Sequence, residues 1–445
     1  MIMSFSDIGN CFGLDFSALQ VKSDIKLTPE QEQVLRELKD FTLFSNKRLF
    51  ALNGIAGSGK STLLIAFIQW LESENKEDYI SVSPTNKACK NLRTKAQKVG
   101  LNIQTKTVAS LLQQKPKLNK VTGLEEFLCA STVDLSDYSL VLLDEYSMLC
   151  ESDFETLLDK ARMHDLKIIL VGDRDQLPPV GESQSVVATS SLIDCRSDLN
   201  TVVRYEGQLA QVVEEIRTGR DGYYKFSDGE GIKVQNFNAW VEQATYLIRS
   251  QDFAKNSDYA RILAWRNKTV DSWNRLMRQQ LWGNNCEQFL PGDRLIAKKP
   301  LFRHGGGDEW RIIVENSEEL VVIDSQVKKT QVLGQEYYYY EVKAKSEEPK
   351  PQLTLFVIHE FSAEKLQQHC TDLKNHKQWK DYGDLRKVFD SIGYSYCLTV
   401  HKSQGSTISN TLLDIGDINA SRYQRRQLAY TALSRTSEKA YILAS

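Results

Sequence analysis

The most constraining feature of the sequence is a glycine-rich segment of eight residues that fits the pattern G-x-x-x-x-G-K-[S/T]. It runs from Gly54 to Ser61 as Gly-Ile-Ala-Gly-Ser-Gly-Lys-Ser. An apolar stretch of strand length, 48–52, precedes it, and a second apolar stretch, 62–68, continues from it as a predicted helix. A plain glycine turn could also start a helix, but both flanks favour a loop that wraps closely around a phosphate group.

The chemistry of such a loop is well defined. Its backbone N–H groups and the positive end of the following helix dipole face the phosphates. Lys60 adds a mobile positive charge for the β- and γ-phosphates, and Ser61 offers its hydroxyl to Mg²⁺. We expect ATP and Mg²⁺ here, with nucleotide contacts from Gly54, Ile55, Ala56, Gly57, Ser58, Gly59, Lys60, Ser61 and Thr62.

Length and charge limit the alternatives. A chain of 445 residues is long for one hydrophobic core, so we expect two to four domains. The formal net charge of −2 excludes a nucleic-acid partner held by overall basicity. Any such binding must come from lysines and arginines gathered in a groove.

Cysteine usage and hydropathy predict the compartment. Eight cysteines without a C-x-x-C pair suit reduced thiols in the cytoplasm. His369, Cys370 and His376 could be read as a metal site, but a solvated helix surface is the favoured interpretation. Residues 1–26 have no leader pattern and no apolar run reaches 18 residues, so we expect neither export nor a membrane span. The arm 1–26 is expected to be poorly ordered or docked on the surface.

Gln31 has two interpretations. The segment 27–38 predicts an amphipathic helix in which Thr28 is the cap, Pro29 occupies the first helical position and Gln31 completes a capping box. Its amide could equally contact adenine, because the phosphate loop follows about twenty residues later and an amide both donates and accepts.

Polar residues follow the next predicted strand, 79–83. Thr85, Asn86 and Lys87 should face the same rim as the phosphate loop, because ligands bind at the carboxyl ends of parallel strands. A hydroxyl, an amide and an ammonium suit a nucleic-acid backbone. An ordinary capped helix explains them about as well. Further on, the polar insertion 113–137 could form a protruding hairpin.

Two more strand ends carry candidate catalytic groups. Asp144 and Glu145 follow the apolar strand 140–143, and we assign Asp144 to Mg²⁺ and Glu145 to the general base. Gln176 follows the strand 167–171 and is fixed by two prolines, so its amide could orient the attacking water or sense the γ-phosphate. A turn with a surface glutamine is the alternative.

Together these segments resemble the successive motifs of superfamily 1 helicases: Gln31, 54–61, 84–86, 144–145 and 172–179. The form G-D-x-x-Q-L-P-P at 172–179 is most similar to the RecD and bacteriophage Dda branch. The resemblance covers about 27–445. It implies an α/β fold of two RecA-like parallel-sheet domains, a P-loop NTPase, with the nucleotide between them.

The resemblance extends to the second half. Arg204 lies where the family places an arginine that reaches across the cleft to the γ-phosphate, and Arg435 ends a segment similar to the sixth motif and acts as an arginine finger. The segment 401–406 is similar to the fifth motif, in which Gln404 and Gly405 are expected beside the nucleotide. An arginine from a second domain stabilises transition-state charge only when the cleft closes, and this dependence would drive a motor.

The expected organisation follows. An arm, 1–26, precedes a first RecA-like domain, 27–200, with a hairpin insertion at about 112–137. A second RecA-like domain consists of 201–290 and 396–445. It is interrupted by 291–360, whose alternating strands and the resemblance imply an SH3-like barrel, and by a helical part, 361–395. The run Tyr337–Tyr340 invites a base-stacking interpretation, but strand packing with two of the four side chains inward is favoured.

Two departures from the family pattern concern strand separation. Thr107-Val108-Ala109-Ser110 stands where Dda-like chains have T-x-H-S, so a contact from that imidazole is missing. The hairpin has no obvious aromatic tip unless Phe127 supplies it. Strand separation is therefore less firmly predicted than ATP hydrolysis.

We expect an ATP-dependent DNA helicase or translocase that acts on single-stranded and forked DNA, 5′ to 3′ by resemblance, in replication, repair or recombination. A monomer is expected, with 1–26 as a candidate site for a protein partner. Rival hypotheses are an RNA-directed motor and a subunit whose ATP state controls assembly without unwinding. The expected DNA contacts are Thr85, Asn86, Lys87, Thr107, Thr399, His401 and Ser403.

Overall fold

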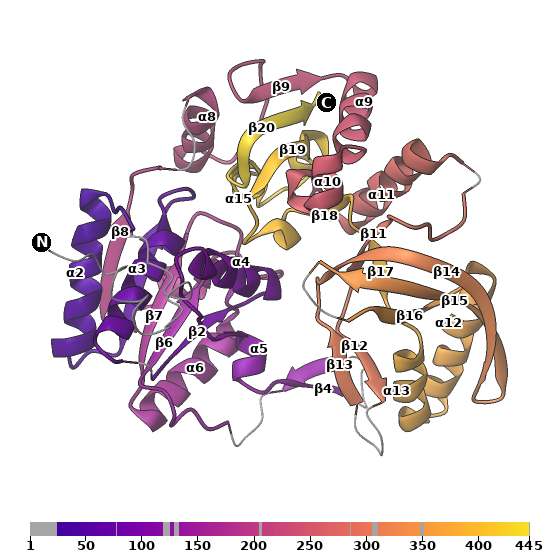
Figure 1. Cartoon of the computed structure of the whole chain (residues 1–445), viewed down its shortest axis with the longest axis horizontal. Coiled ribbons are helices and arrows are strands. Elements are labelled where there is room, and N and C mark those ends of the chain that lie inside the picture. Colours follow the sequence, from indigo (N-terminus) through magenta and orange to yellow (C-terminus); the bar gives the residue numbers. More distant parts are fainter. Residues whose placement is uncertain are drawn as a thin grey trace, which may run out of the picture.

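The computed structural model describes residues 25–76, 78–118, 125–128, 133–203, 207–284, 286–304, 310–347 and 351–444. The described residues form three lobes, which Figure 1 shows arranged around a common centre. The first and second lobes each contain a parallel sheet, and the third contains an antiparallel sheet. Within these residues no helix has the length and apolar character needed to cross a membrane.

The first lobe holds a six-stranded parallel sheet of order β3-β2-β6-β7-β1-β8. Its strands are β1 (Leu49–Gly54), β2 (Tyr79–Ser83), β3 (Thr105–Thr107), β6 (Leu140–Asp144), β7 (Lys167–Gly172) and β8 (Cys195–Leu199). Its helices are α2 (Pro29–Phe44), α3 (Lys60–Ser73), α4 (Asn86–Gln97), α5 (Val108–Leu111), α6 (Glu151–His164) and α7 (Val186–Thr189).

Both faces of this sheet are covered, which explains why the central strands β6 and β7 contain the apolar runs 140–143 and 168–171. Leu142 packs with α2, α3 and α4 on one face, whereas its neighbours Val141 and Leu143 pack with α5, α6 and α7 on the other. The short strands β4 (Lys115–Leu118) and β5 (Glu125–Leu128) pair as an antiparallel hairpin. In Figure 1, β4 extends toward the third lobe. Phe127 lies in β5, but its side chain is outside the described part of the structure.

The second lobe is assembled from two distant parts of the chain. Its parallel sheet has the order β18-β10-β19-β20-β9. The strands are β9 (Ile232–Gln235), β10 (Ala260–Ala264), β18 (Cys397–Thr399), β19 (Ile408–Asp414) and β20 (Thr436–Leu443). Its helices are α8 (Gly207–Thr218), α9 (Phe237–Ile248), α10 (Gln251–Lys255), α11 (Asn267–Trp282), α14 (Ile415–Asn419) and α15 (Arg425–Leu433). These results confirm the predicted α/β fold with two parallel-sheet units.

The third lobe lies between those two parts of the chain. Its antiparallel sheet has the order β16-β15-β14-β11-β17, and a separate hairpin is formed by β12 and β13. The strands are β11 (Arg294–Ala297), β12 (Leu301–His304), β13 (Trp310–Val314), β14 (Glu319–Val332), β15 (Gln335–Ser346), β16 (Leu353–Ile358) and β17 (Ile392–Tyr394). Helices α12 (Glu360–Asn375) and α13 (Trp379–Val388) accompany them.

The tyrosine run lies in β15 and packs as an ordinary strand. Tyr337 and Tyr340 are buried, whereas Tyr338 and Tyr339 are half-buried. The Tyr337 hydroxyl lies 2.6 Å from Nδ1 of His369 on α12. The Tyr340 ring packs edge-on against Phe289 in the core of the antiparallel sheet. Two of the four rings are therefore buried, which is the predicted number, but they lie on opposite faces of β15 because they are three positions apart.

Asp293 joins the second lobe to the third. Its carboxylate is fully buried and accepts hydrogen bonds from Arg278 Nη2 at 2.9 Å, Tyr396 Oη at 2.8 Å and Trp282 Nε1 at 3.1 Å. Arg278 and Trp282 lie on α11, whereas Asp293 directly precedes β11. A buried charge with this many donors is stable only while all of them remain in place.

We predict that Asp293→Ala lowers the free energy of unfolding by about 3–5 kcal/mol, because it leaves the Arg278 guanidinium buried without its partner. Urea unfolding followed by circular dichroism measures this. Asp159→Ala is the matched control, since that carboxylate is 70% exposed and lies 3.5 Å from Arg162. The control should change stability by less than about 0.5 kcal/mol, and equal losses in both variants would contradict the prediction.

Candidate nucleotide site and nucleic-acid face

The phosphate loop connects β1 to α3 as predicted. Gly57 and Gly59 have positive φ angles of 83° and 79°, which side chains rarely adopt. Gly54 is needed for space, because a Cβ there would lie 2.7 Å from Cγ of Lys60. Helix α3 begins at Lys60, so its first N–H groups and its dipole face the loop. This geometry fits the binding of a phosphate chain.

Lys60 is surrounded by opposite charge. Its Nζ donates to the carbonyl oxygens of Gly54 at 2.5 Å and Ile55 at 3.1 Å. Burial lowers the pKa of Lys60, and the carboxylates of Asp173, Glu145 and Asp144 act against that effect. The carboxylates at the ends of β6 and β7 therefore converge on the lysine of the loop.

Gln31 performs the predicted capping role and a further one. Its amide oxygen accepts from the Thr28 N–H at 2.9 Å, and the Thr28 hydroxyl accepts from the Gln31 N–H at 3.2 Å. Its amide nitrogen donates to the Ser58 carbonyl at 2.9 Å, so the side chain also stabilises the conformation of the phosphate loop. Contact with adenine stays a prediction.

Asp144 and Glu145, the predicted metal ligand and general base, adjoin the phosphate loop at the end of β6. Asp144 ends β6 and is buried, and burial together with the neighbouring Glu145 raises the pKa of its carboxyl to about 6. Glu145 has a φ of 62°, and its Oε2 is buried without a hydrogen-bond partner among the described residues. A nearby cation would stabilise a buried carboxylate oxygen that has no hydrogen-bond donor. Ser61 and Asp144 thus offer the oxygen ligands that Mg²⁺ prefers.

Asp173 is a site residue to which sequence reasoning assigned no role. It follows β7 as Asp144 ends β6, and it is 1% exposed. Burial raises the pKa of its carboxyl, while Lys60 and Tyr430 lower it. Its Oδ2 accepts from Gln176 Nε2 at 3.1 Å. The aspartate of the motif G-D-x-x-Q was the signal that could have identified it. Gln176 itself is buried, so the alternative of a surface glutamine is wrong.

Arg435 reaches the first lobe from the second. It lies between α15 and β20, is 3% exposed, and places Nη1 3.6 Å from Oε1 of Glu145. The predicted finger therefore points at the predicted base. Arg204 lies outside the described residues. Its neighbour Val203 donates its N–H to the Gly57 carbonyl at 2.8 Å, which brings the chain just before Arg204 to the phosphate loop.

Apolar packing reinforces this contact between the lobes. Ala56 of the phosphate loop and Leu177 after β7 belong to the same buried cluster as Leu428 and Leu433 of α15. The Ala56 N–H donates to the Tyr430 hydroxyl at 2.9 Å. The nucleotide side of the two lobes is therefore closed by buried groups from both.

The two residues of the fifth motif have different neighbours. Gln404 is buried, and its Nε2 donates to the Leu177 carbonyl at 2.9 Å, which places it at the cleft. Gly405 instead packs on Ala88, and its carbonyl accepts from Asn91 Nδ2 at 2.5 Å. Both contacts are on α4, and the position of Gly405 beside the nucleotide stays a prediction.

Three of the predicted DNA contacts make local hydrogen bonds. The hydroxyls of Thr85 and Thr107 cap α4 and α5, and that of Thr399 accepts from the Lys402 N–H at 3.2 Å. The prediction that Ser403 contacts DNA is wrong, because Ser403 is fully buried and its hydroxyl donates to the Val400 carbonyl at 2.8 Å. His401 is half-buried, and burial lowers its pKa, which favours the neutral ring.

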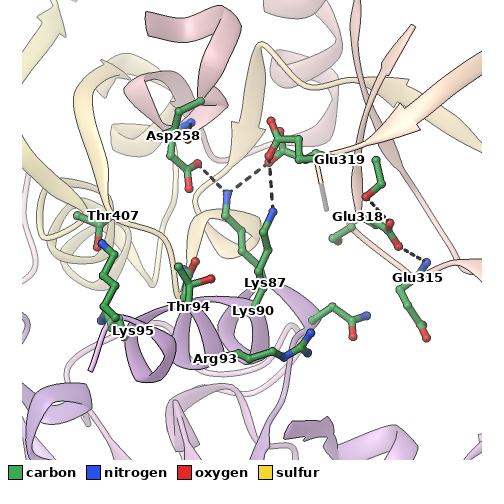
Figure 2. A pocket seen from close by; sticks show the side chains of 17 residues that line it. Lys87, Lys90, Arg93, Thr94, Lys95, Asp258, Glu315, Glu318, Glu319 and Thr407 are labelled. Carbon is green, nitrogen blue, oxygen red and sulfur yellow. Dashed lines mark hydrogen bonds and ion pairs between the residues drawn. The ribbon is translucent and has the colours of Figure 1, made fainter. Parts of the chain in front are cut away.

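Asn86 and Lys87 line a cavity of about 520 Å³ between α4 and the third lobe, which Figure 2 shows. Its α4 wall is basic, with Lys87, Lys90, Arg93, Lys95 and Lys98. Its opposite wall is acidic, with Asp258, Glu315, Glu318, Glu319 and Glu347. The basic wall would attract a phosphate backbone, whereas the acidic wall opposite would repel it.

Lys87 is held by the acidic wall in this structure. Its Nζ lies 2.8 Å from Oδ1 of Asp258 and 3.3 Å from Oε1 of Glu319 (Figure 2). Arg261 Nη2 pairs with Glu319 at 2.9 Å. Burial alone would raise the pKa of Glu319, but Arg261 and Lys87 outweigh it and hold the value at about 2. Lys87 can contact a phosphate only after it leaves these carboxylates.

Comparison with known proteins agrees with this site. Residues 26–245 match a family described as an AAA domain, and 394–443 match one described as a UvrD-like helicase C-terminal domain. The chain is 25% identical to the ATP-dependent DNA helicase dda of Enterobacteria phage T4, over 87% of this chain and 93% of that protein. These matches support a superfamily 1 helicase of the RecD and Dda type.

Two further similarities accord with that assignment. The ATP-dependent RecD2 DNA helicase of Deinococcus radiodurans is 31% identical over 176 residues, which are 40% of this helicase and 22% of RecD2. The structure of Bacteroides Pif1 bound to single-stranded DNA has a TM-score of 0.52 at 16% identity, covering 95% of this chain and 93% of that one. The likeness to Pif1 shows the fold alone.

We predict that Arg435→Ala lowers the kcat of ATP hydrolysis in this helicase by about 10³, the usual contribution of an arginine finger. Steady-state phosphate release measures it. Arg425→Ala is the matched control, because Arg425 lies on α15 but donates to the Asn419 carbonyl at 2.8 Å, outside the contacts with the first lobe. A similar kcat in the two variants would show that Arg435 is not a finger.

We also predict that Asp258→Asn strengthens binding of single-stranded DNA about fivefold, equivalent to about 1 kcal/mol, because Lys87 is then held less tightly. The plot of log affinity against log salt should steepen by about 0.7 if Lys87 gains a phosphate contact. Fluorescence anisotropy measures both quantities. Asp252→Asn makes the same charge change at an exposed position on α10. An unchanged salt slope would identify Lys87 as a structural residue.

Proposed function

We propose that this chain is an ATP-dependent DNA helicase that moves 5′ to 3′ on single-stranded DNA and separates duplex DNA. The observation that carries the proposal is the meeting of Lys60 and Glu145 from the first lobe with Arg435 from the second. A lysine, a base and an arginine supplied by separate lobes are the groups that nucleotide hydrolysis in a closing cleft requires. The direction of movement follows from the RecD and Dda branch.

The side chains divide the work of hydrolysis. Lys60 binds the β- and γ-phosphates, and Glu145 takes the proton of the attacking water. Arg435 stabilises charge on the γ-phosphoryl oxygens, and we assign Arg204 to the same task. Mg²⁺, held by Ser61 and Asp144, would neutralise charge on the phosphates when bound. Gln176 orients the water.

Movement follows from cleft closure. Arg435 acts only while the lobes are together, so binding of ATP favours the closed arrangement and loss of the phosphate allows it to open. If the two lobes grip the strand alternately, each cycle moves the protein along DNA. We assign that grip to Thr85, Asn86, Lys87, Thr107, Thr399 and His401, which would bind backbone without sequence preference.

Related structures extend the proposal to forked DNA. A Pif1 complex with a TM-score of 0.52, at 15% identity, concerns unwinding at forked double-stranded DNA. We propose forked DNA as a substrate here, with the β4–β5 hairpin as the separating element.

We also propose a monomeric protein that acts in the cytoplasm, where the cysteines of the described residues, all free thiols, would stay reduced. The arm 1–26 is proposed as a site for a protein partner, and the boundaries at 27, 201, 291, 361 and 396 as those of the domains.

We predict that the protein displaces strands from a 5′-tailed duplex and not from a 3′-tailed one, when ATP and Mg²⁺ are present. Lys60→Ala should abolish unwinding but retain single-stranded DNA affinity within about twofold, because Lys60 contacts phosphates of the nucleotide alone. Gel-based strand displacement and fluorescence anisotropy measure the two quantities. Retained unwinding by Lys60→Ala would contradict the mechanism.

Two controls test the rival functions. ATPase stimulation by single-stranded DNA and by RNA of the same length separates a DNA motor from an RNA motor, and a strong preference for RNA would overturn the choice of DNA. Hydrolysis without displacement of either tailed duplex would favour the assembly subunit instead.

A further inference from the structure

The hydroxyl of Tyr430 connects the second lobe to two catalytic elements of the first. It accepts a hydrogen bond from the N–H of Ala56 in the phosphate loop at 2.9 Å and donates one to Oδ2 of Asp173 at 2.8 Å. The side chain lies on α15 and is 1% exposed. A buried hydroxyl with a donor on one side and a carboxylate on the other has its orientation fixed.

The segment after β7 is held by the second lobe at both ends. At Asp173 the partner is Tyr430. At Leu177 the N–H donates to the Thr431 hydroxyl at 3.1 Å, and the carbonyl accepts from Gln404 Nε2 at 2.9 Å. Every one of these bonds crosses between the lobes, so an opening that separates these groups would break them. The conformation of 173–177 is therefore tied to closure.

Gln176 lies within that segment and depends on it for its orientation. Its Nε2 donates to the same Oδ2 of Asp173 that accepts from Tyr430, at 3.1 Å. Its Oε1 is buried, with no hydrogen-bond partner among the described residues, in a side chain that is 2% exposed. Because one end of the amide is fixed by Asp173, the free acceptor is aimed in one direction. An acceptor of this kind can hold the hydrogen of a water molecule.

We propose that Tyr430 is a positioning residue for ATP hydrolysis that acts through Asp173 on Gln176. In the closed cleft the Tyr430 hydroxyl fixes the Asp173 carboxylate, and that carboxylate orients the Gln176 amide. When the lobes part, Asp173 loses this partner and Gln176 is free to turn. Hydrolysis is then confined to the closed arrangement. The inference rests on the proposed ATPase function.

The test is Tyr430→Phe, which removes the hydroxyl and keeps the ring. We expect kcat for DNA-stimulated ATP hydrolysis to fall between about tenfold and a hundredfold, the cost of poor alignment of a reacting group. KM for ATP should stay within about threefold, because the lost interaction orients the amide and does not bind the nucleotide. Phosphate release at varied ATP concentration separates the two parameters.

Tyr396→Phe is the matched control. Tyr396 is equally buried in the second lobe, and its hydroxyl also donates to a carboxylate at 2.8 Å, that of Asp293. It lies outside the contacts between the phosphate loop and α15. Both variants should lose similar thermal stability, and only Tyr430→Phe should lose kcat. Equal kcat in the two variants would overturn the proposal.

A double-mutant cycle tests the route through Gln176. Gln176→Ala should lower kcat by itself, and adding Tyr430→Phe to it should change kcat by less than about twofold, because the residue that Tyr430 positions is already gone. If the two losses multiply instead, Tyr430 acts by another route and the proposal fails.

Two safeguards keep the outcomes distinct. Thr431→Val removes the hydroxyl that accepts the hydrogen bond from the Leu177 N–H, and it should lower kcat in the same way. This variant serves as the test if Tyr430→Phe does not fold. An unchanged kcat in Thr431→Val would then overturn the proposal. Wild-type protein without DNA-stimulated ATPase activity would instead refute the proposed function. Wild-type activity with an unaffected Tyr430→Phe would refute this inference alone.

Discussion

The charges buried between the first and second lobes are the constraint on which the rest of the structure depends. Lys60 and Arg435 lie among the carboxylates of Asp144, Glu145 and Asp173. Three carboxylates and two cations leave an excess of negative charge between the lobes, and burial together with Glu145 raises the pKa of Asp144 to about 6. Lys60 offsets only part of the negative charge of the first lobe, and Arg435 of the second lobe offsets more of it, so closure stabilises both lobes.

Closure of the first and second lobes also affects the candidate nucleic-acid face at α4, because adjacent residues of one loop contact both places. Gln404 donates to Leu177 beside the nucleotide site, whereas Gly405 accepts from Asn91 on α4, the helix that carries the basic wall. A change in the spacing of the lobes therefore affects the two faces together. This arrangement gives a physical basis for coupling between hydrolysis and DNA binding, because one rigid segment contacts both sites.

The third lobe adds a second set of charges to this arrangement. Its Glu319 joins Arg261 of the second lobe and Lys87 of the first in one buried cluster. Breaking one member of such a cluster leaves an uncompensated charge, which makes the cluster a strong connection. If Lys87 contacts DNA as we propose, a phosphate must compete with Asp258 and Glu319 for it.

Local patterns were sufficient for the phosphate loop, the capping box at Gln31 and the positions of Asp144 and Gln176. Each depends on residues close in sequence or on the rule that parallel strands present their carboxyl ends at one edge. The prediction for Ser403 was wrong because a motif indicates which segment lies near a ligand, whereas packing decides which of its side chains face that ligand. The buried Ser403 hydroxyl and the contact of Gly405 with α4 are both results of packing.

The sequence by itself determined the fold class, the loop that binds phosphate and the carboxylates that follow the buried strands, since these follow from periodicity and short spacing. Only the tertiary structure decided that Tyr430 meets Ala56, that Asp173 links Tyr430 to Gln176, and that Lys87 is held by Asp258 and Glu319. Ala56 and Tyr430 are 374 positions apart. Contacts over such separations depend on how complete lobes pack together, and no local pattern records that.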